Sequence, residues 1–356
     1  MTDQNNAPAL TTLFERVRLE PWGTDYLGSV QDAGNAYTDP DVADEGATPP
    51  LDPAALEVEV PLADWRPLVG RAAMQAERIM FLDGVRRVEA RLLVEDQTLL
   101  FGALGSCAVA AVVSQPGEGQ AQYVGQPHVE RWCALGGGRA EQGTLVVEAH
   151  GGGQRLEYRI AATPENDVDA PVRLLQSKML EAERLLAARL LPELGDGLLL
   201  CDGPRPLLGD DRRVLGYIKT VQAQRLPREA LDVVRSLAAG ERSPLYLVGS
   251  GEVTRYEWYL RLRHPGAWAH TLAGSVRLQA YAGLNPAAHL EWARSLADWS
   301  CSNQPRFATA SHQDPRAPQQ LLPVRALEST LRRRLGSAPL LRRRIVSALS
   351  VGGTGS

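Results

Sequence analysis

Two short apolar runs in this chain end on the same dipeptide, Asp-Gly. One occupies residues 79–84 (Ile-Met-Phe-Leu-Asp-Gly) and the other residues 198–203 (Leu-Leu-Leu-Cys-Asp-Gly). A short apolar run followed by turn residues is typical of a buried strand. We therefore predict that Asp83 and Asp202 each close a strand, and that the glycine after each lets backbone or ligand come close.

The rest of the hydrophobic pattern predicts further elements. Strands are expected over 78–83, 88–94, 98–113, 143–149, 155–160, 197–202, 243–249, 258–263 and 272–281, and helices over 10–19, 172–191, 212–224, 227–239, 287–298, 324–335 and 339–349. The helix over 172–191 has the clearest amphipathic repeat. Residues 67–78 are expected to form a loop and a short helix. Short turns make the first three strands antiparallel neighbours, with Gly84 in the first turn.

This order of elements predicts the fold class. Antiparallel strands, then a helix, then a strand ending on Asp202 fit an α/β fold with an RNase H-like mixed sheet flanked by helices, in which Asp83 and Asp202 project from adjacent strands. We predict three regions: an acidic, partly flexible N-terminal extension (1–66), an RNase H-like domain (67–323), and Arg-rich C-terminal helices with a tail (324–356).

Composition narrows the class of protein. The 356 residues are 44% hydrophobic and 22% charged, which is ordinary for a soluble globular protein. No apolar run reaches the length of a membrane span, and the first residues lack the features of a signal peptide. The four cysteines form no Cys-x-x-Cys pair, which argues against structural zinc. We expect a cytoplasmic protein with no membrane partner.

Charge is distributed unevenly along the chain. The formal net charge is only −4, which excludes a uniformly basic nucleic-acid binder. Residues 1–66 carry thirteen acids against three arginines, whereas residues 321–348 carry seven arginines and one acid, Glu328. Such asymmetry indicates a basic surface that faces phosphates or an acidic partner. Two solvated helix faces explain the charge alone equally well.

Several side chains are candidates for a metal site. Asp83 and Asp202 supply two carboxylates, and the helix over 172–191 offers Glu183, which flanks the apolar stripe, or Glu181 as the alternative. His312 adds an imidazole. This donor set suits Mn²⁺, with Mg²⁺ as the alternative.

Two such ions about 4 Å apart can activate water and stabilise the leaving oxygen in phosphodiester cleavage. Lys219 is a candidate to neutralise the scissile phosphate. Each feature also has an ordinary structural interpretation: Asp-Gly as a turn, Glu183 as an exposed helix residue, His312 as a loop residue, and Lys219 as a solvated cation.

The same residues carry a resemblance to a known family. Residues 81–91, 179–183, 201–204, 216–220 and 310–312 resemble, in this order, the motifs of the NurA nucleases, in a bacterial branch of that family, and the likeness covers residues 77–334. It implies an RNase H-like fold, a homodimer, a HerA-type hexameric ATPase as partner, and Mn²⁺-dependent exonuclease and endonuclease activity on single- and double-stranded DNA.

The resemblance also implies residue roles. It assigns metal binding to Asp83, Glu183 or Glu181, Asp202 and His312. Gln304 stands before Pro305 where archaeal relatives have tyrosine, so that role is absent or moves to Tyr217.

Taken together, the residues and the resemblance predict a metal-dependent DNA nuclease, and the resemblance implies that it acts in double-strand break end resection. The DNA contacts expected are Arg86, Arg332, Arg333 and Arg334, with Arg342, Arg343 and Arg344 facing either DNA or the ATPase. One rival is a non-catalytic dimeric DNA-binding adaptor of a translocase, against which the unbroken carboxylate set argues. A less favoured rival is an actin-like phosphotransferase, which needs a further Gly-rich adenosine motif.

Overall fold

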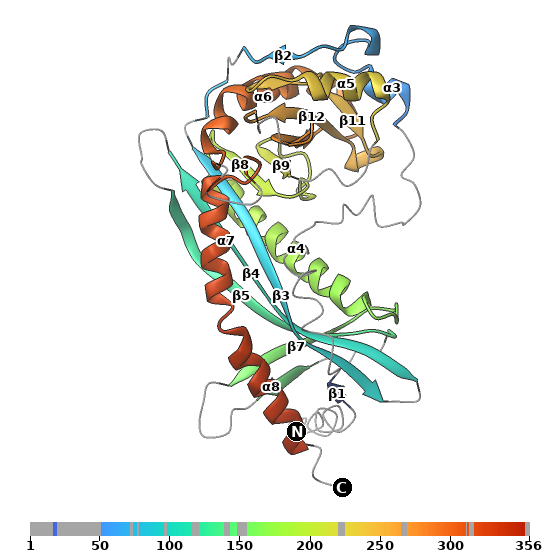
Figure 1. The fold of residues 1–356 in the computed structure, drawn as a ribbon, viewed down its shortest axis with the longest axis vertical. Helices are drawn as coiled ribbons and strands as arrows, with labels where there is room; N and C mark the ends of the chain where they lie inside the picture. Colours follow the sequence, from blue (N-terminus) through green and yellow to red (C-terminus); the bar gives the residue numbers. More distant parts are fainter. Residues whose placement is uncertain are drawn as a thin grey trace, which may run out of the picture.

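The computed structural model describes residues 17–19, 51–71, 74–76, 78–95, 98–115, 121–138, 143–147, 155–219, 225–264, 269–310, 312 and 317–352. These residues form an α/β fold around one large mixed sheet, as the sequence predicted. The sheet order is β2-β10-β12-β13-β9-β8-β3-β4-β5-β7-β6, with β1 paired to β3 and β11 paired to β12. Helices flank the sheet (Figure 1).

The strands are β1 (Val17–Leu19), β2 (Leu68–Val69), β3 (Ile79–Glu95), β4 (Leu99–Ser114), β5 (Gln122–Leu135), β6 (Thr144–Val147), β7 (Leu156–Ala162), β8 (Leu198–Asp202), β9 (Val214–Ile218), β10 (Glu241–Arg242), β11 (Tyr246–Val248), β12 (Arg255–Arg261) and β13 (Ser275–Tyr281). The helices used below are α3 (Pro53–Leu56), α4 (Ala170–Leu190), α5 (Arg228–Ser236), α6 (Leu290–Asn303), α7 (Leu322–Arg334) and α8 (Ala338–Gly352).

The first Asp-Gly does not end a strand. The two strands predicted over 78–83 and 88–94 are a single strand, β3, of 17 residues, and Gly84 pairs with Val109 in the ladder with β4. The predicted turn at Gly84 is therefore wrong. The residues on both sides of Gly84 are buried, so pairing with β4 continues through it and no turn forms.

Two helices cover opposite faces of the long strands. Alternate residues of a strand point to opposite faces. Phe81 and Val85 belong to the cluster that contains the apolar stripe of α7, whereas Met80 and Leu82 pack with the end of α4. In Figure 1, α7 runs beside β3, and α4 crosses the sheet on the other side.

β8 brings the second Asp-Gly beside the first. It pairs in parallel with the start of β3, from Ile79↔Leu198 to Leu82↔Cys201, and with β9 on its other side. The predicted adjacency of these strands is confirmed. β8 has only five residues, so β3 continues past its end. A mid-strand aspartate, Asp83, thus lies next to a strand-terminal one, Asp202.

Other predicted elements differ from the structure. The helix over 212–224 is wrong, because residues 214–218 form β9, buried between β8 and β13. Residues 17–19 of the helix over 10–19 form β1 instead, and the rest of that prediction lies outside the described residues. In 67–78, the described residues include β2 and no helix. The strand β5 was not predicted, because its first half is polar and exposed.

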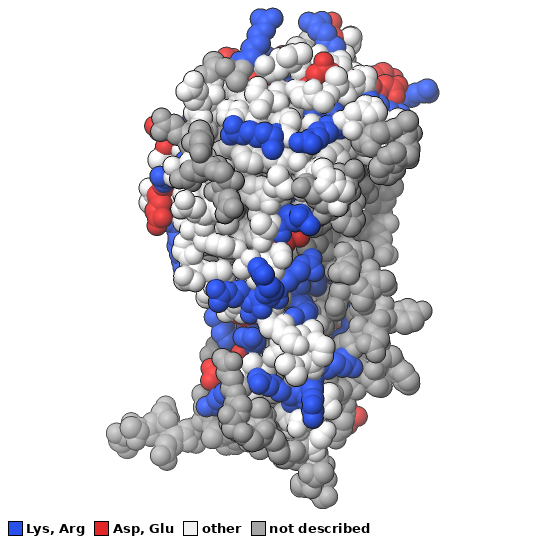
Figure 2. Space-filling model, turned by 60° about the vertical axis from the view of Figure 1, so that its left-hand side comes forward, with Lys and Arg blue, Asp and Glu red and all other residues white. Residues whose placement is uncertain are grey.

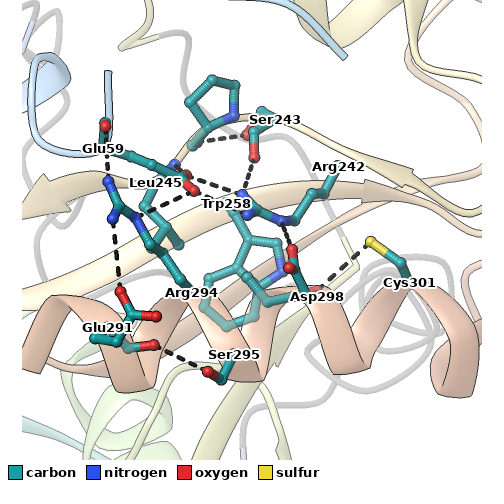
Figure 3. A network of polar contacts seen from close by, with 12 residues as sticks. Glu59, Arg242, Ser243, Leu245, Trp258, Glu291, Arg294, Ser295, Asp298 and Cys301 are labelled. Carbon is teal, nitrogen blue, oxygen red and sulfur yellow. Dashed lines mark hydrogen bonds and ion pairs between the residues drawn. The ribbon is translucent and has the colours of Figure 1, made fainter. Parts of the chain in front are cut away.

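A buried charge network fastens the N-terminal segment to α6. Arg242 donates to both carboxylate oxygens of Glu59 at 2.9 Å and to Asp298 Oδ1 at 2.8 Å (Figure 3). The Leu245 backbone N–H also donates to Glu59, at 2.7 Å. Buried charges need such partners. Residues 51–66 of the predicted extension therefore pack on the lobe that contains α5 and α6, whereas residues 17–19 pair with β3.

The structure also shows the state of the cysteines and the character of the helices. All four cysteines lie in the described part of the chain, are buried, and form no disulfide. Among the described residues, no helix combines the length and the apolar composition of a membrane span.

Candidate metal centre

Three carboxylates from distant parts of the sequence meet at the end of β8. Asp83, Asp202 and Glu328 each offer one oxygen, and these oxygens all lie within 4.8 Å of one another. They come from the fifth residue of β3, the end of β8 and the buried face of α7. The fold thus brings the two predicted aspartates together and adds a third acid.

Asp83 is as deeply buried as Glu328, and both are more buried than Asp202. Asp83 shares the α7 face of β3 with Phe81 and Val85 and is only 5% exposed. Its Oδ1 accepts a hydrogen bond from the Gly84 backbone N–H at 2.8 Å, whereas the buried Oδ2 has no hydrogen-bond partner. Burial, followed by the charges of Asp202 and Glu328, raises the pKa of Asp83 well above its ordinary range. A cation between the carboxylates would satisfy Oδ2 and lower that pKa.

Glu328 was not among the predicted ligands. It is buried on the apolar stripe of α7, between Val324 and Leu331, and its Oε1 accepts a hydrogen bond from Gln320 Nε2 at 3.0 Å. The sequence held a signal for it: Glu328 is the one acid in the Arg-rich segment 321–348 and is spaced to share the helix face that carries the leucines.

Lys219 lies inside the cluster. It follows β9, and its Nζ donates hydrogen bonds to Asp202 Oδ2 and Gln320 Oε1 and lies 3.6 Å from Glu328 Oε1. Only 9% of its side chain is exposed. The interpretation of Lys219 as a solvated cation is therefore wrong.

Glu183 approaches from the other face of the sheet. It is buried on α4, and a Cβ added to Gly84 would lie 2.5 Å from Glu183 Oε1, so the absence of a side chain at residue 84 admits this carboxylate. Burial and then the charge of Asp202 raise the pKa of Glu183 to about 8. Glu183 is not part of the three-oxygen group.

Glu181 has different surroundings. Half of its side chain is exposed (50%), and it pairs with Lys178 Nζ at 2.9 Å. Of the two glutamates considered from the sequence, the structure places Glu183 beside the site and Glu181 on the outer surface of α4.

The remaining candidates do not join the three-oxygen group. His312 is exposed. Arg86 donates to Gln176 Oε1 at 2.5 Å. Tyr217 is buried, opposite Asp202 in the β8–β9 ladder, and donates to the Gln319 carbonyl at 2.7 Å. Gln304 is fully buried, and neither side-chain polar atom has a hydrogen-bond partner.

The exposed face of α7 carries the predicted DNA contacts. Arg332, Arg333 and Arg334 are exposed in its last turn. Arg325 is exposed one turn before Glu328. The same helix therefore presents an acid to the site and arginines to the surface.

No protein-family model matches the chain, and no curated protein is significantly similar to it. The resemblance to the NurA family therefore stays a prediction from short motifs.

Proposed function

We propose that the protein is a metal-dependent nuclease that hydrolyses DNA. One observation carries this proposal: Asp83, Asp202 and Glu328 converge in a buried group in which Asp83 Oδ2 has no hydrogen-bond partner. Buried polar atoms are nearly always satisfied, so the unpartnered oxygen favours a cation as its partner. The oxygen-only donor set suits Mn²⁺ or Mg²⁺.

The chain's own residues fit such an ion. Asp83, Asp202 and Glu328 would hold it, with Glu183 within reach across Gly84. When bound, a divalent ion in such a site supplies a polarised water and neutralises charge on the phosphate. Glu183, buried on α4 behind Gly84, is the candidate to accept a proton during hydrolysis.

The topology agrees with an RNase H-like sheet. β3, β4 and β5 are sequential antiparallel neighbours, β6, β7 and then α4 follow, and β8 pairs in parallel with β3. The homodimer, the HerA-type ATPase partner and the role in break resection rest on the resemblance to the NurA family and are part of this proposal.

The basic surface supports DNA as the substrate. Figure 2 shows Lys and Arg side chains gathered on the face where α7 and α8 lie, with few acidic side chains among them. Arg332, Arg333, Arg334 and Arg343 are exposed on these helices. A row of arginines binds the phosphate backbone without reading sequence.

The test is degradation of end-labelled linear DNA in Mn²⁺, in Mg²⁺ and in EDTA. We expect metal-dependent loss of label with the wild-type protein, none with Asp83→Asn, and wild-type loss with Asp232→Asn, a half-exposed acid on α5. DNA binding without cleavage in any metal would contradict the nuclease and favour the adaptor.

A further inference from the structure

Lys219 is the internal cation of the carboxylate cluster. Its ammonium group has three N–H donors, and three acceptors surround it: Asp202, Gln320 and Glu328. Two of the donors make hydrogen bonds, to Asp202 and Gln320, and Glu328 Oε1 lies 3.6 Å from Nζ as an ion-pair partner. While Lys219 stays in this position, its charge is engaged by Asp202 and Glu328 and not by a substrate phosphate.

We propose that a divalent ion displaces Lys219 from Asp202 and Glu328, and that the released ammonium then binds a phosphate oxygen of the substrate. Metal loading and phosphate binding are thereby coupled through one side chain. This inference rests on the metal site of the proposed function.

Lys219 and a divalent ion compete for the same carboxylate oxygens. Asp202 and Glu328 are two of the three acids that converge, and both contact Lys219. Two cations about 4 Å apart repel strongly in a buried site. Asp83 Oδ2 is the oxygen that Lys219 leaves unpaired, so an ion can enter there and then recruit the other two acids.

Lys219 is also held in place by the side chain of Gln320. Gln320 is fully buried and bridges the pair: its Oε1 accepts from Lys219 and its Nε2 donates to Glu328 at 3.0 Å. The neighbouring Gln319 carbonyl is fixed by Tyr217 Oη at 2.7 Å. When Lys219 leaves, Gln320 keeps its bond to Glu328, so the acid stays oriented while the flexible lysine side chain moves.

The experiment compares Mn²⁺ binding in the full-length wild-type protein, Lys219→Met and Lys178→Met, by calorimetry without DNA. Methionine keeps the volume and removes the competing charge, whereas Lys178 pairs with the outward-facing Glu181 and serves as the matched control. We expect Lys219→Met to bind Mn²⁺ about tenfold more tightly or more, because a like charge is removed from the site, and Lys178→Met to bind as the wild type does.

A second readout follows the released ammonium. Inorganic phosphate should bind the Mn²⁺-loaded wild type more tightly than Mn²⁺-loaded Lys219→Met. Where methionine prevents folding, as judged by circular dichroism, Lys219→Gln gives the same comparison with a neutral hydrogen-bonding side chain.

The outcomes separate this inference from the proposed function. Equal or weaker Mn²⁺ binding by a folded Lys219 variant would overturn the displacement and leave the metal site standing. No Mn²⁺ binding by the wild type would overturn the metal site, and the inference with it.

Discussion

At the scale of the residue, a glycine and an unpaired oxygen define the site. Gly84 has no side chain between β3 and α4, so the Glu183 carboxylate packs against Gly84, the residue after Asp83. The second oxygen of Asp83 is buried without a partner. Keeping buried carboxylates charged costs free energy unless a cation is bound beside them.

The two helix glutamates should differ sharply. We expect Glu183→Gln to lower the rate of DNA cleavage by about a hundredfold or more, which is the usual contribution of a positioned acid or base. Glu181→Gln, on the outer surface of α4, should cleave at the wild-type rate. The check is a time course with end-labelled DNA in Mn²⁺, and equal rates for the two variants would contradict the role given to Glu183.

The metal-free protein should lose stability as pH rises. The pKa of Glu183 lies near 8 in the folded state against an ordinary value of 4.5, so the folded state binds more protons between these values. Stability is then complete at low pH within this range and falls as pH rises toward about 8. Added Mn²⁺ should reverse the loss.

Urea denaturation in EDTA between about pH 5 and about pH 9 measures this, with the free energy of unfolding expected to fall across the range. Glu183→Gln should flatten the fall. A wild-type profile that rises toward pH 8 would contradict the burial of Glu183 as a protonated group.

At the scale of the element, unequal strand lengths create the site. β8 has five residues and β3 has 17, so the last residue of β8 lies beside the fifth residue of β3, which continues to Glu95. α7 then closes the group from the opposite face to α4 and contributes Glu328.

Gly84→Ala tests the close approach of Glu183 on α4 to Gly84 on β3. Its Cβ would lie 2.5 Å from Glu183 Oε1 and 3.1 Å from Met179 Cγ and Val109 Cγ1. We expect a loss of about 1–3 kcal/mol in the free energy of unfolding, as for other overpacked core sites, together with weaker Mn²⁺ binding because Glu183 is displaced.

Gly102→Ala in β4 is the control, because the Cβ there would meet Leu135, Leu92 and a backbone carbonyl, and no carboxylate. It should reduce stability without changing Mn²⁺ affinity, as measured by denaturation and calorimetry. Weaker Mn²⁺ binding in both variants would show a general effect of strand packing.

The sequence predicts much of this arrangement for identifiable reasons. The apolar runs before Asp83 and Asp202 and the stripe of α4 reflect burial, which local pattern records. The continuity of β3 was missed because Asp-Gly is typical of turns, whereas pairing with β4 keeps Gly84 extended. Glu328 was missed because the packing of α7 on β3 is a tertiary contact, although its lone negative charge among arginines marked it.

At the scale of the whole molecule, the site lies where two parts of the fold join. The lobe with β9 to β13, α5 and α6 meets the long strands β3, β4 and β5 near the end of β8 (Figure 1). Arg242, Glu59 and Asp298 stabilise the lobe away from the site (Figure 3). α7 extends from the site along the long strands and carries its arginines outward.

The exposed arginines of α7 should govern DNA affinity without affecting metal binding. We expect the combined Arg332→Gln, Arg333→Gln and Arg334→Gln variant to bind DNA more weakly. The slope of log K against log salt concentration should become shallower by about two to three, since each phosphate contact contributes about one. Mn²⁺ affinity should stay unchanged. A variant with Arg228→Gln and Arg235→Gln on α5 is the control, and an equal loss there would indicate a net-charge effect.

Anomalous diffraction from Mn²⁺-soaked crystals tests the central claim most directly. A metal centre formed by Asp83, Asp202 and Glu328 predicts an anomalous peak in contact with all three carboxylates, and its loss in Asp83→Asn. A structure with Mn²⁺ in the solvent that shows no peak there, with Lys219 still bonded to Asp202, would contradict the metal centre and the nuclease built on it.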